Sequence, residues 1–108
     1  MFKDLVLFLR TIGSYNLNLK RDFDKAIKFF EMVLKLESSN TEAQYNLAAS
    51  YINKYYNTIK DKDPSYLDKA EKLLKNILDN STNPKELELS KEAINKISEL
   101  RKTSNLSR

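Results

Sequence analysis

The chain has 108 residues, of which 41% are hydrophobic and 31% charged, with one glycine and two prolines. This composition is too apolar for a disordered chain, and the scarcity of turn-forming residues favours helices over a β fold. Cysteine and histidine are absent, which excludes disulfides, thiolate chemistry, the usual zinc sites and the commonest general base. The net charge of +4 is a mild excess that attracts acidic partners only weakly.

The first predicted helix covers about residues 2–16. Four of its apolar residues recur at helical spacing and predict a core-facing stripe: Leu5, Phe8, Leu9 and Ile12. Val6 and Leu7 fall off this stripe, so the helix is apolar on more than one side. Such a helix is buried in the interior of a stack or covered by another chain. Gly13 is expected to weaken its last turns, and residues 15–21 are expected to form a connection.

The apolar run in this helix is short. It covers the five residues 5–9, far fewer than the roughly 20 that a membrane-spanning helix needs. Asp4 precedes the run, Arg10 follows it, and no small-residue cleavage site is present. Neither a membrane span nor a signal peptide is therefore expected, and the compartment is not predicted.

Four more helices are predicted by apolar periodicity, at about residues 22–37, 41–59, 64–78 and 84–102. The first of these is apolar nearly all round, which is typical of a central helix. The expected core positions, helix by helix, are Phe23, Ala26, Ile27, Phe30, Val33 and Leu34; Ala48, Tyr51, Tyr55 and Ile59; Leu67, Ala70, Leu74 and Ile77; and Leu87, Ile94, Ile97 and Leu100.

Three capping signals support these helix starts. Ser39 with Glu42 fits the S-x-x-E capping box. Asp63–Pro64 and Asn83–Pro84 each place a capping residue before a proline at the first helical position. Glu86 completes a second box after Asn83.

An internal repeat links two of the predicted helices. The segment Asp24–Phe30 aligns with Asp68–Leu74, and both begin with Asp-Lys-Ala. The offset is 44 residues. The physical interpretation is two helical hairpins that cannot bury their apolar faces alone and therefore stack.

Several of these residues resemble the pattern of the tetratricopeptide repeat (TPR). The small, aromatic and small-to-medium positions of its second helix are matched by Ala26, Phe30 and Val33, with a weaker copy at Ala70, Leu74 and Ile77. The first-helix pattern of the repeat is similar to the segment Tyr45-Asn46-Leu47-Ala48 followed by Tyr51. The turn between its helices is similar to Asp22-Phe23-Asp24.

Three features depart from that family. The 44-residue offset exceeds the usual 34 residues, which implies a 10-residue insertion at about residues 52–63. Ser38 and Thr82 stand where the repeat's closing proline is usual, and the helix at residues 2–16 matches the pattern poorly.

The resemblance implies an all-α fold. We expect antiparallel helical hairpins stacked as a short TPR-like array of about five helices, with the last helix as a C-terminal cap because its outer face is polar. Residues 1–102 are expected to form a single domain, and residues 103–108 a flexible tail.

The resemblance also implies a binding face, because the first helices of successive hairpins line the concave side of such an array. The clear first helix is the one at residues 41–59. Its second stripe contains the predicted partner-binding residues Tyr45, Ala49, Ile52, Asn53 and Tyr56. The tyrosines supply apolar area and a hydroxyl, Ala49 leaves room for a ligand backbone, and Asn53 offers hydrogen bonds. The alternative is that the first and fifth helices cover this stripe.

The predicted function is a non-enzymatic interaction module that binds a peptide or helix of a partner protein. The alternative is a homo-oligomerisation domain that pairs through Val6 and Leu7. No catalytic, cofactor or metal site is predicted, because the chain has no phosphate loop, nucleophile elbow or tuned general base. Asp22 and Asp24 are interpreted as compensating a helix dipole.

One basic and aromatic segment raises the alternative of nucleic-acid binding. It contains Lys54, Lys60 and Lys62 with Tyr55 and Tyr56, the residue types that follow a phosphate backbone and stack on bases. Acidic residues at positions 61 and 63 dilute the charge. A solvated loop after buried tyrosines is the preferred interpretation.

Overall fold

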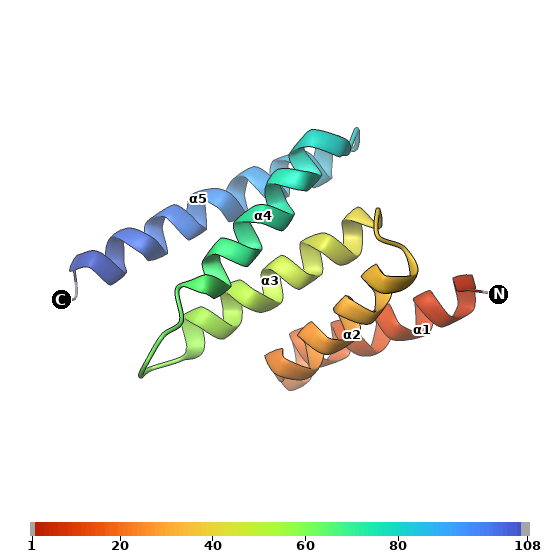
Figure 1. Cartoon of the computed structure of the whole chain (residues 1–108), viewed down its shortest axis with the longest axis horizontal. Helices are drawn as coiled ribbons and strands as arrows, with labels where there is room; N and C mark the ends of the chain where they lie inside the picture. Colours follow the sequence, from red (N-terminus) through yellow and green to blue (C-terminus); the bar gives the residue numbers. More distant parts are fainter. Residues whose placement is uncertain (1, 107–108) are drawn as a thin grey trace.

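The computed structural model describes residues 2–106, which form five α-helices and one short π-helix and contain no strand (Figure 1). The elements are α1 (Phe2–Tyr15), η1 (Asn16–Lys20), α2 (Phe23–Leu36), α3 (Thr41–Asn57), α4 (Ser65–Asn80) and α5 (Pro84–Leu106). Each α-helix packs antiparallel against the next, so the predicted all-α array is confirmed. Helix α5 continues four residues past its expected end, into the segment 103–108 that was expected to be a tail.

The starts of the helices are held by side chains that accept otherwise unpaired backbone N–H groups. Asp22, Asn40 and Asn83 cap α2, α3 and α5 with hydrogen bonds of 2.9–3.2 Å. The predicted cap at Ser39 is therefore wrong by one residue. Before α4, the Asp63 carboxylate accepts the backbone N–H of the second residue after it at 2.9 Å. Around α5 the predicted box is altered, since Glu86 accepts from the Ser81 hydroxyl.

The main core joins α2, α3, α4 and α5, and most of its predicted residues are confirmed. Its fully or nearly fully buried members include Ala26, Phe30, Ala48, Tyr51, Tyr55, Leu67, Ala70, Leu74, Ile77 and Ile97. Ile59 is an exception, because α3 ends at Asn57 and leaves this side chain 92% exposed. Of the other predicted core positions, Val33 is buried against α1 instead, and Leu87 is half-buried and belongs to neither core cluster.

The side of α1 that faces the core is not the side predicted from the sequence. Val6 and Leu9 are buried against α2 and α3, whereas Leu5 and Phe8 are exposed. The prediction that Val6 lies outside the core of its own chain is therefore wrong. Gly13 is buried on the same side as Val6 and Leu9, at the helical spacing i, i+3, i+7.

Gly13 marks a close approach of α1 and α2. A Cβ placed there would lie 2.9 Å from two ring carbons of Phe30, and this ring is fully buried. The glycine predicted to weaken α1 is thus the residue that lets the aromatic ring of α2 pack against the α1 backbone.

The connection predicted between the first two helices is itself helical. The π-helical turn η1 continues α1, and the chain leaves it through Arg21, whose φ of 53° is left-handed. The carbonyl of Asn16 accepts the backbone N–H groups of both Arg21 and Asp22. This arrangement turns the chain into α2 within two residues.

Helix α3 is held to both of its neighbours through Tyr51. The Tyr51 ring stacks on Tyr66 of α4, with centroids 5.9 Å apart. Its hydroxyl donates to Glu31 of α2 at 3.4 Å. Burial first, and then the Glu31 carboxylate, raise the pKa of Tyr51 to about 12.

We predict that Gly13→Ala destabilises the fold. Overpacking a dense core typically costs about 1–3 kcal/mol, which exceeds the roughly 1 kcal/mol that alanine gains over glycine in a helix. Urea denaturation should therefore show a lower midpoint. The exposed change Thr11→Ala is the control and should stay within about 0.5 kcal/mol. A Gly13→Ala protein as stable as the parent would contradict the close contact.

We also predict an alkaline loss of stability that depends on Tyr51. Its pKa is higher in the folded state, at about 12, than the ordinary value of 10.0. The contribution is therefore complete below pH 10 and is lost as the pH rises toward 12. Between about pH 9 and about pH 11, the urea midpoint should fall less for Tyr51→Phe than for the parent. Equal falls in the two proteins would contradict the prediction, and Tyr15→Phe serves as an exposed control.

Candidate functional site

An open groove lies between α3 and α5, with a volume of about 540 Å³. One wall is the second stripe of α3, formed by Tyr45, Ala49, Ile52, Asn53 and Tyr56. The other wall comes from α5 and contains Leu89, Glu92, Ala93 and Lys96. The five residues predicted from sequence thus line one hollow, while the α5 wall was not predicted.

The groove has an apolar floor and a more polar rim. Ala49 and Ala93, one from each wall, are half-buried and small, so they leave space between the helices. Ile52 and Leu89 add half-buried apolar surface. Tyr56 stands exposed at the rim. Helix α5 therefore flanks the predicted stripe without burying it, and α1 does not line the groove.

Two polar side chains on the α3 wall have defined environments. The side-chain NH₂ of Asn53 donates to the Ala49 carbonyl at 2.8 Å. The amide oxygen of Asn53 can then accept a hydrogen bond from a ligand. The pKa of Tyr45 is raised, first by burial and then by the carboxylate of Glu92. Its hydroxyl therefore stays protonated at neutral pH and can donate a hydrogen bond.

The α5 wall carries a negative charge toward one end of the groove and a positive charge toward the other. The carboxylate of Glu92 acts on Tyr45, whereas the ammonium of Lys96 lies 5.9 Å from the ring centroid of Tyr56. Because these α5 residues are one helical turn apart, the groove is acidic near Tyr45 and basic near Tyr56.

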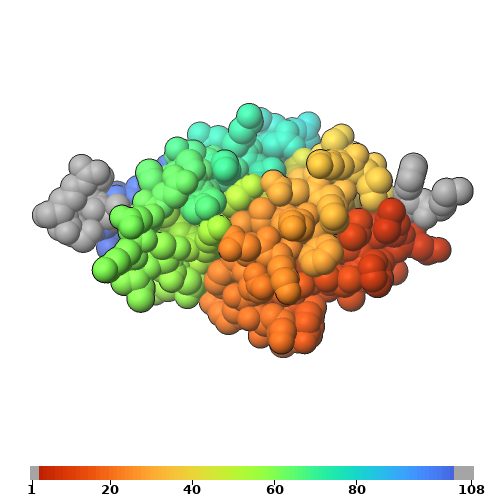
Figure 2. All heavy atoms as spheres, turned by 60° about the horizontal axis from the view of Figure 1, so that its bottom comes forward, coloured from red at the N-terminus to blue at the C-terminus, as the bar shows by residue number. Residues whose placement is uncertain are grey.

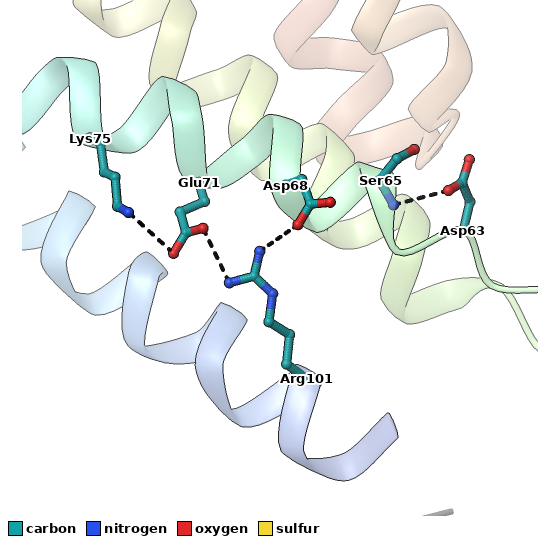
Figure 3. Close-up of polar contacts among 6 residues, drawn as sticks. All are labelled: Asp63, Ser65, Asp68, Glu71, Lys75 and Arg101. Atoms are coloured by element: carbon teal, nitrogen blue, oxygen red, sulfur yellow. Dashed lines mark hydrogen bonds and ion pairs between the residues drawn. The ribbon is translucent and has the colours of Figure 1, made fainter. Parts of the chain in front are cut away.

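The α5 wall is held in place by buried side chains, including Ser90 and Ile97, and by a cluster of ion pairs (Figure 3). Ile97 is fully buried in the main core. Nearer the C-terminal end, the Arg101 guanidinium reaches Asp68 at 2.7 Å and Glu71 at 3.2 Å on α4. Glu71 also lies 3.8 Å from Lys75. The two ion pairs of Arg101 link α5 to α4 near one end of the groove.

Two other hollows differ in character from this groove. One, of about 580 Å³, lies along α4 and is lined mainly by charged and amide side chains: Gln44, Asp68, Glu71, Lys72, Leu73, Lys75, Asn76 and Asp79. The other, of about 480 Å³, lies at the turn before α2 and is similarly polar. Five of the eight side chains that line the α4 hollow are exposed, and Asp68, Glu71 and Lys75 already take part in ion pairs within the chain. The α3–α5 groove, whose two walls both contribute half-buried apolar side chains, is therefore the better candidate.

The remaining predicted side chains take part in contacts within the chain. Lys54 pairs with Asp24 and lies over the Tyr66 ring at 4.8 Å. The Lys62 ammonium donates to the carbonyls of Tyr55 and Tyr56 at 2.9 and 3.2 Å, which closes the C-terminal end of α3. Two of the three lysines of the basic segment thus stabilise helices rather than forming one exposed patch.

Among residues 2–106, no group of three or more His, Cys, Asp or Glu side chains could hold a metal ion. None of the helices in this part of the chain is long and apolar enough to cross a membrane. Comparison with known proteins found no matching family model, no matching curated protein and no matching solved structure.

We predict that Glu92→Gln lowers the pKa of Tyr45 part of the way toward its ordinary value. Burial, the larger cause, remains, while the carboxylate that disfavours the phenolate is removed. Alkaline titration followed by ¹³C NMR of the tyrosine rings measures this pKa. The neighbouring exposed change Glu88→Gln is the control. An unchanged Tyr45 titration in Glu92→Gln would show that this end of the groove lacks the proposed charge contact.

Proposed function

We propose that this protein is a non-enzymatic, TPR-like interaction module that binds a peptide or helix of a partner protein in the α3–α5 groove. One observation carries the proposal. Five residues on a single side of α3 and four on a single side of α5 line one open groove with an apolar floor. Grooves between packed helices commonly accept the apolar face of an amphipathic helix.

The shape and polarity of the groove support a helical ligand. Ala49 and Ala93 leave room for a backbone or for small side chains, while Ile52 and Leu89 offer apolar contact. Exposed tyrosine at the rim is typical of interface residues that combine apolar area with a hydroxyl. A ligand with apolar residues at positions i, i+3 or i+4, and i+7 satisfies this floor.

The opposite charges toward the two ends of the groove favour one orientation of such a ligand. A helix carries partial positive charge at its N-terminus and partial negative charge at its C-terminus. The N-terminus is therefore favoured beside Glu92, at the Tyr45 end, and the C-terminus beside Lys96, at the Tyr56 end. This arrangement supports binding of a peptide in a defined direction.

The proposal is tested with peptides selected against the parent protein from a display library of amphipathic helical sequences. Their affinity is then measured by fluorescence anisotropy. Tyr56→Ala removes the apolar area of an aromatic residue at the rim, and Ala93→Gln occupies the space that the ligand needs. Each change should therefore weaken binding about tenfold, which corresponds to about 1.4 kcal/mol.

Tyr15→Ala is the matched control, because it removes another exposed tyrosine that lies on α1. It should leave peptide affinity unchanged. Circular dichroism should confirm that all variants keep their helix content. If folded Tyr56→Ala and Ala93→Gln proteins bind as tightly as the parent, the groove is not the binding site.

A further inference from the structure

The two ends of the helical stack differ in the surface that they expose. Among the side chains whose burial the structure describes, eight large hydrophobic ones are exposed; five come from α1 and η1, and none from residues 84–103 of α5. Helical arrays need a polar outer face on their terminal helices to stay soluble. Helix α5 provides such a face at one end. At the other end, α1, η1 and α2 lie at the surface (Figure 2).

The exposed apolar residues of this end follow a helical stripe. Leu5, Phe8, Tyr15 and Leu19 are exposed by 44%, 60%, 49% and 74%, and half-buried Ile12 lies between them. The spacing of 3, 4, 3 and 4 residues places them along one side of α1 and its continuation η1. We call these five residues the α1 stripe. Leu7 is exposed too, but its position in the helix is outside this stripe.

The outermost residues of the α1 stripe, and the charged residues beside them, are symmetric about Ile12. Leu5 and Leu19 are each seven residues from Ile12, and Asp4 and Lys20 are each eight residues from it. Asp4 and Lys20 are exposed, and neither forms an ion pair within residues 2–106. A two-fold axis through Ile12 therefore places Leu5 against Leu19 of a second copy and Asp4 against Lys20 of that copy.

The apolar area of the stripe is comparable to what a stable dimer requires. Side chains of this size offer on the order of 150–200 Å² when free, so the four exposed ones present roughly 400 Å² per chain. An interface of standard size buries about 800 Å² on each partner, of which roughly 450 Å² is apolar. We propose that two copies of this chain pair antiparallel through the α1 stripe, with Asp4 and Lys20 closing both ends.

This pairing places a defined set of atoms near the two-fold axis. Packed helix axes lie about 8–10 Å apart, and each Cα lies about 2.3 Å from its own axis, so facing Cα atoms approach to roughly 3.5–5.5 Å. That distance is within the reach of a disulfide. The chain contains no cysteine, so an introduced cysteine can form a disulfide only with the same residue of a second copy.

The test combines cross-linking with sedimentation velocity across protein dilution. Under mild oxidation, Ile12→Cys should form a covalent dimer, because residue 12 meets itself across the axis. Leu7→Cys is the matched control on the same helix and should not form the covalent dimer. Phe8→Glu should raise the dimer dissociation constant at least tenfold, whereas Ile59→Glu, at another exposed apolar side chain, should leave it unchanged.

The end charges provide a second, independent measurement. Asp4→Lys should weaken the dimer about three- to tenfold, because both symmetric ion pairs become repulsive. The double change Asp4→Lys/Lys20→Asp should restore the affinity, which non-specific apolar association would not do. Circular dichroism checks the folding of each variant.

Three results would overturn the dimer: a parent protein that is monomeric at millimolar concentration, a dimer insensitive to Phe8→Glu, or cross-linking by Leu7→Cys but not by Ile12→Cys. A monomeric parent would assign the stripe to another occupant, such as a helical hairpin of a different chain. The outcome is separable from that of the groove, since Phe8→Glu should retain peptide binding and Tyr56→Ala should retain the dimer.

Discussion

Close helix packing at small residues is the constraint on which the rest of this structure depends. Ala26, Ala48 and Ala70 are fully buried, one in each of α2, α3 and α4, and Gly13 contacts Phe30 between α1 and α2. Small residues let helix axes approach closely while larger side chains fill the gaps between hairpins. The rotation of each helix about its own axis follows from these contacts.

For α3, that rotation separates a side that faces the main core from a side that faces the groove. Ala48, Tyr51 and Tyr55 face the main core, which leaves Ala49 and Tyr56 beside α5 in the groove. The groove is therefore a product of the core packing. A change that rotated α3 to repack its buried tyrosines would also displace the α3 wall of the groove.

The sequence predicted helices α2 to α5 well because in each of them apolar residues recur at helical spacing and are separated by polar residues. Helix α1 lacks this contrast. Its run of five consecutive apolar residues fits more than one helical phase, and the choice of Leu5 and Phe8 for the core was wrong. The deciding signal was Gly13, which lies at helical spacing from Val6 and Leu9. A glycine can mark a close contact as well as a weak helix.

The candidate site was predicted only in part for a related reason. The α3 wall follows from the periodicity within one helix, so all five of its residues could be named. The α5 wall depends on how α5 crosses α3, which is fixed by packing distant in sequence. Its core residue Ile97 was predicted, but the position of Ala93 and Lys96 beside α3 is a tertiary result. Likewise, the ion pairs of Arg101 join residues 30 and 33 positions apart.

The attachment of α5 makes one wall of the groove less firmly held than the other. Helix α3 packs between α2 and α4, whereas α5 packs chiefly on α4, through Ile97 and the solvent-accessible ion pairs of Arg101. Regions with fewer buried contacts open locally at lower free energy than the core. A ligand that touches both walls would tie α5 to the best-anchored helix. Ligand binding would then raise the free energy needed to open α5, so that occupancy of the groove and local unfolding of α5 become linked equilibria.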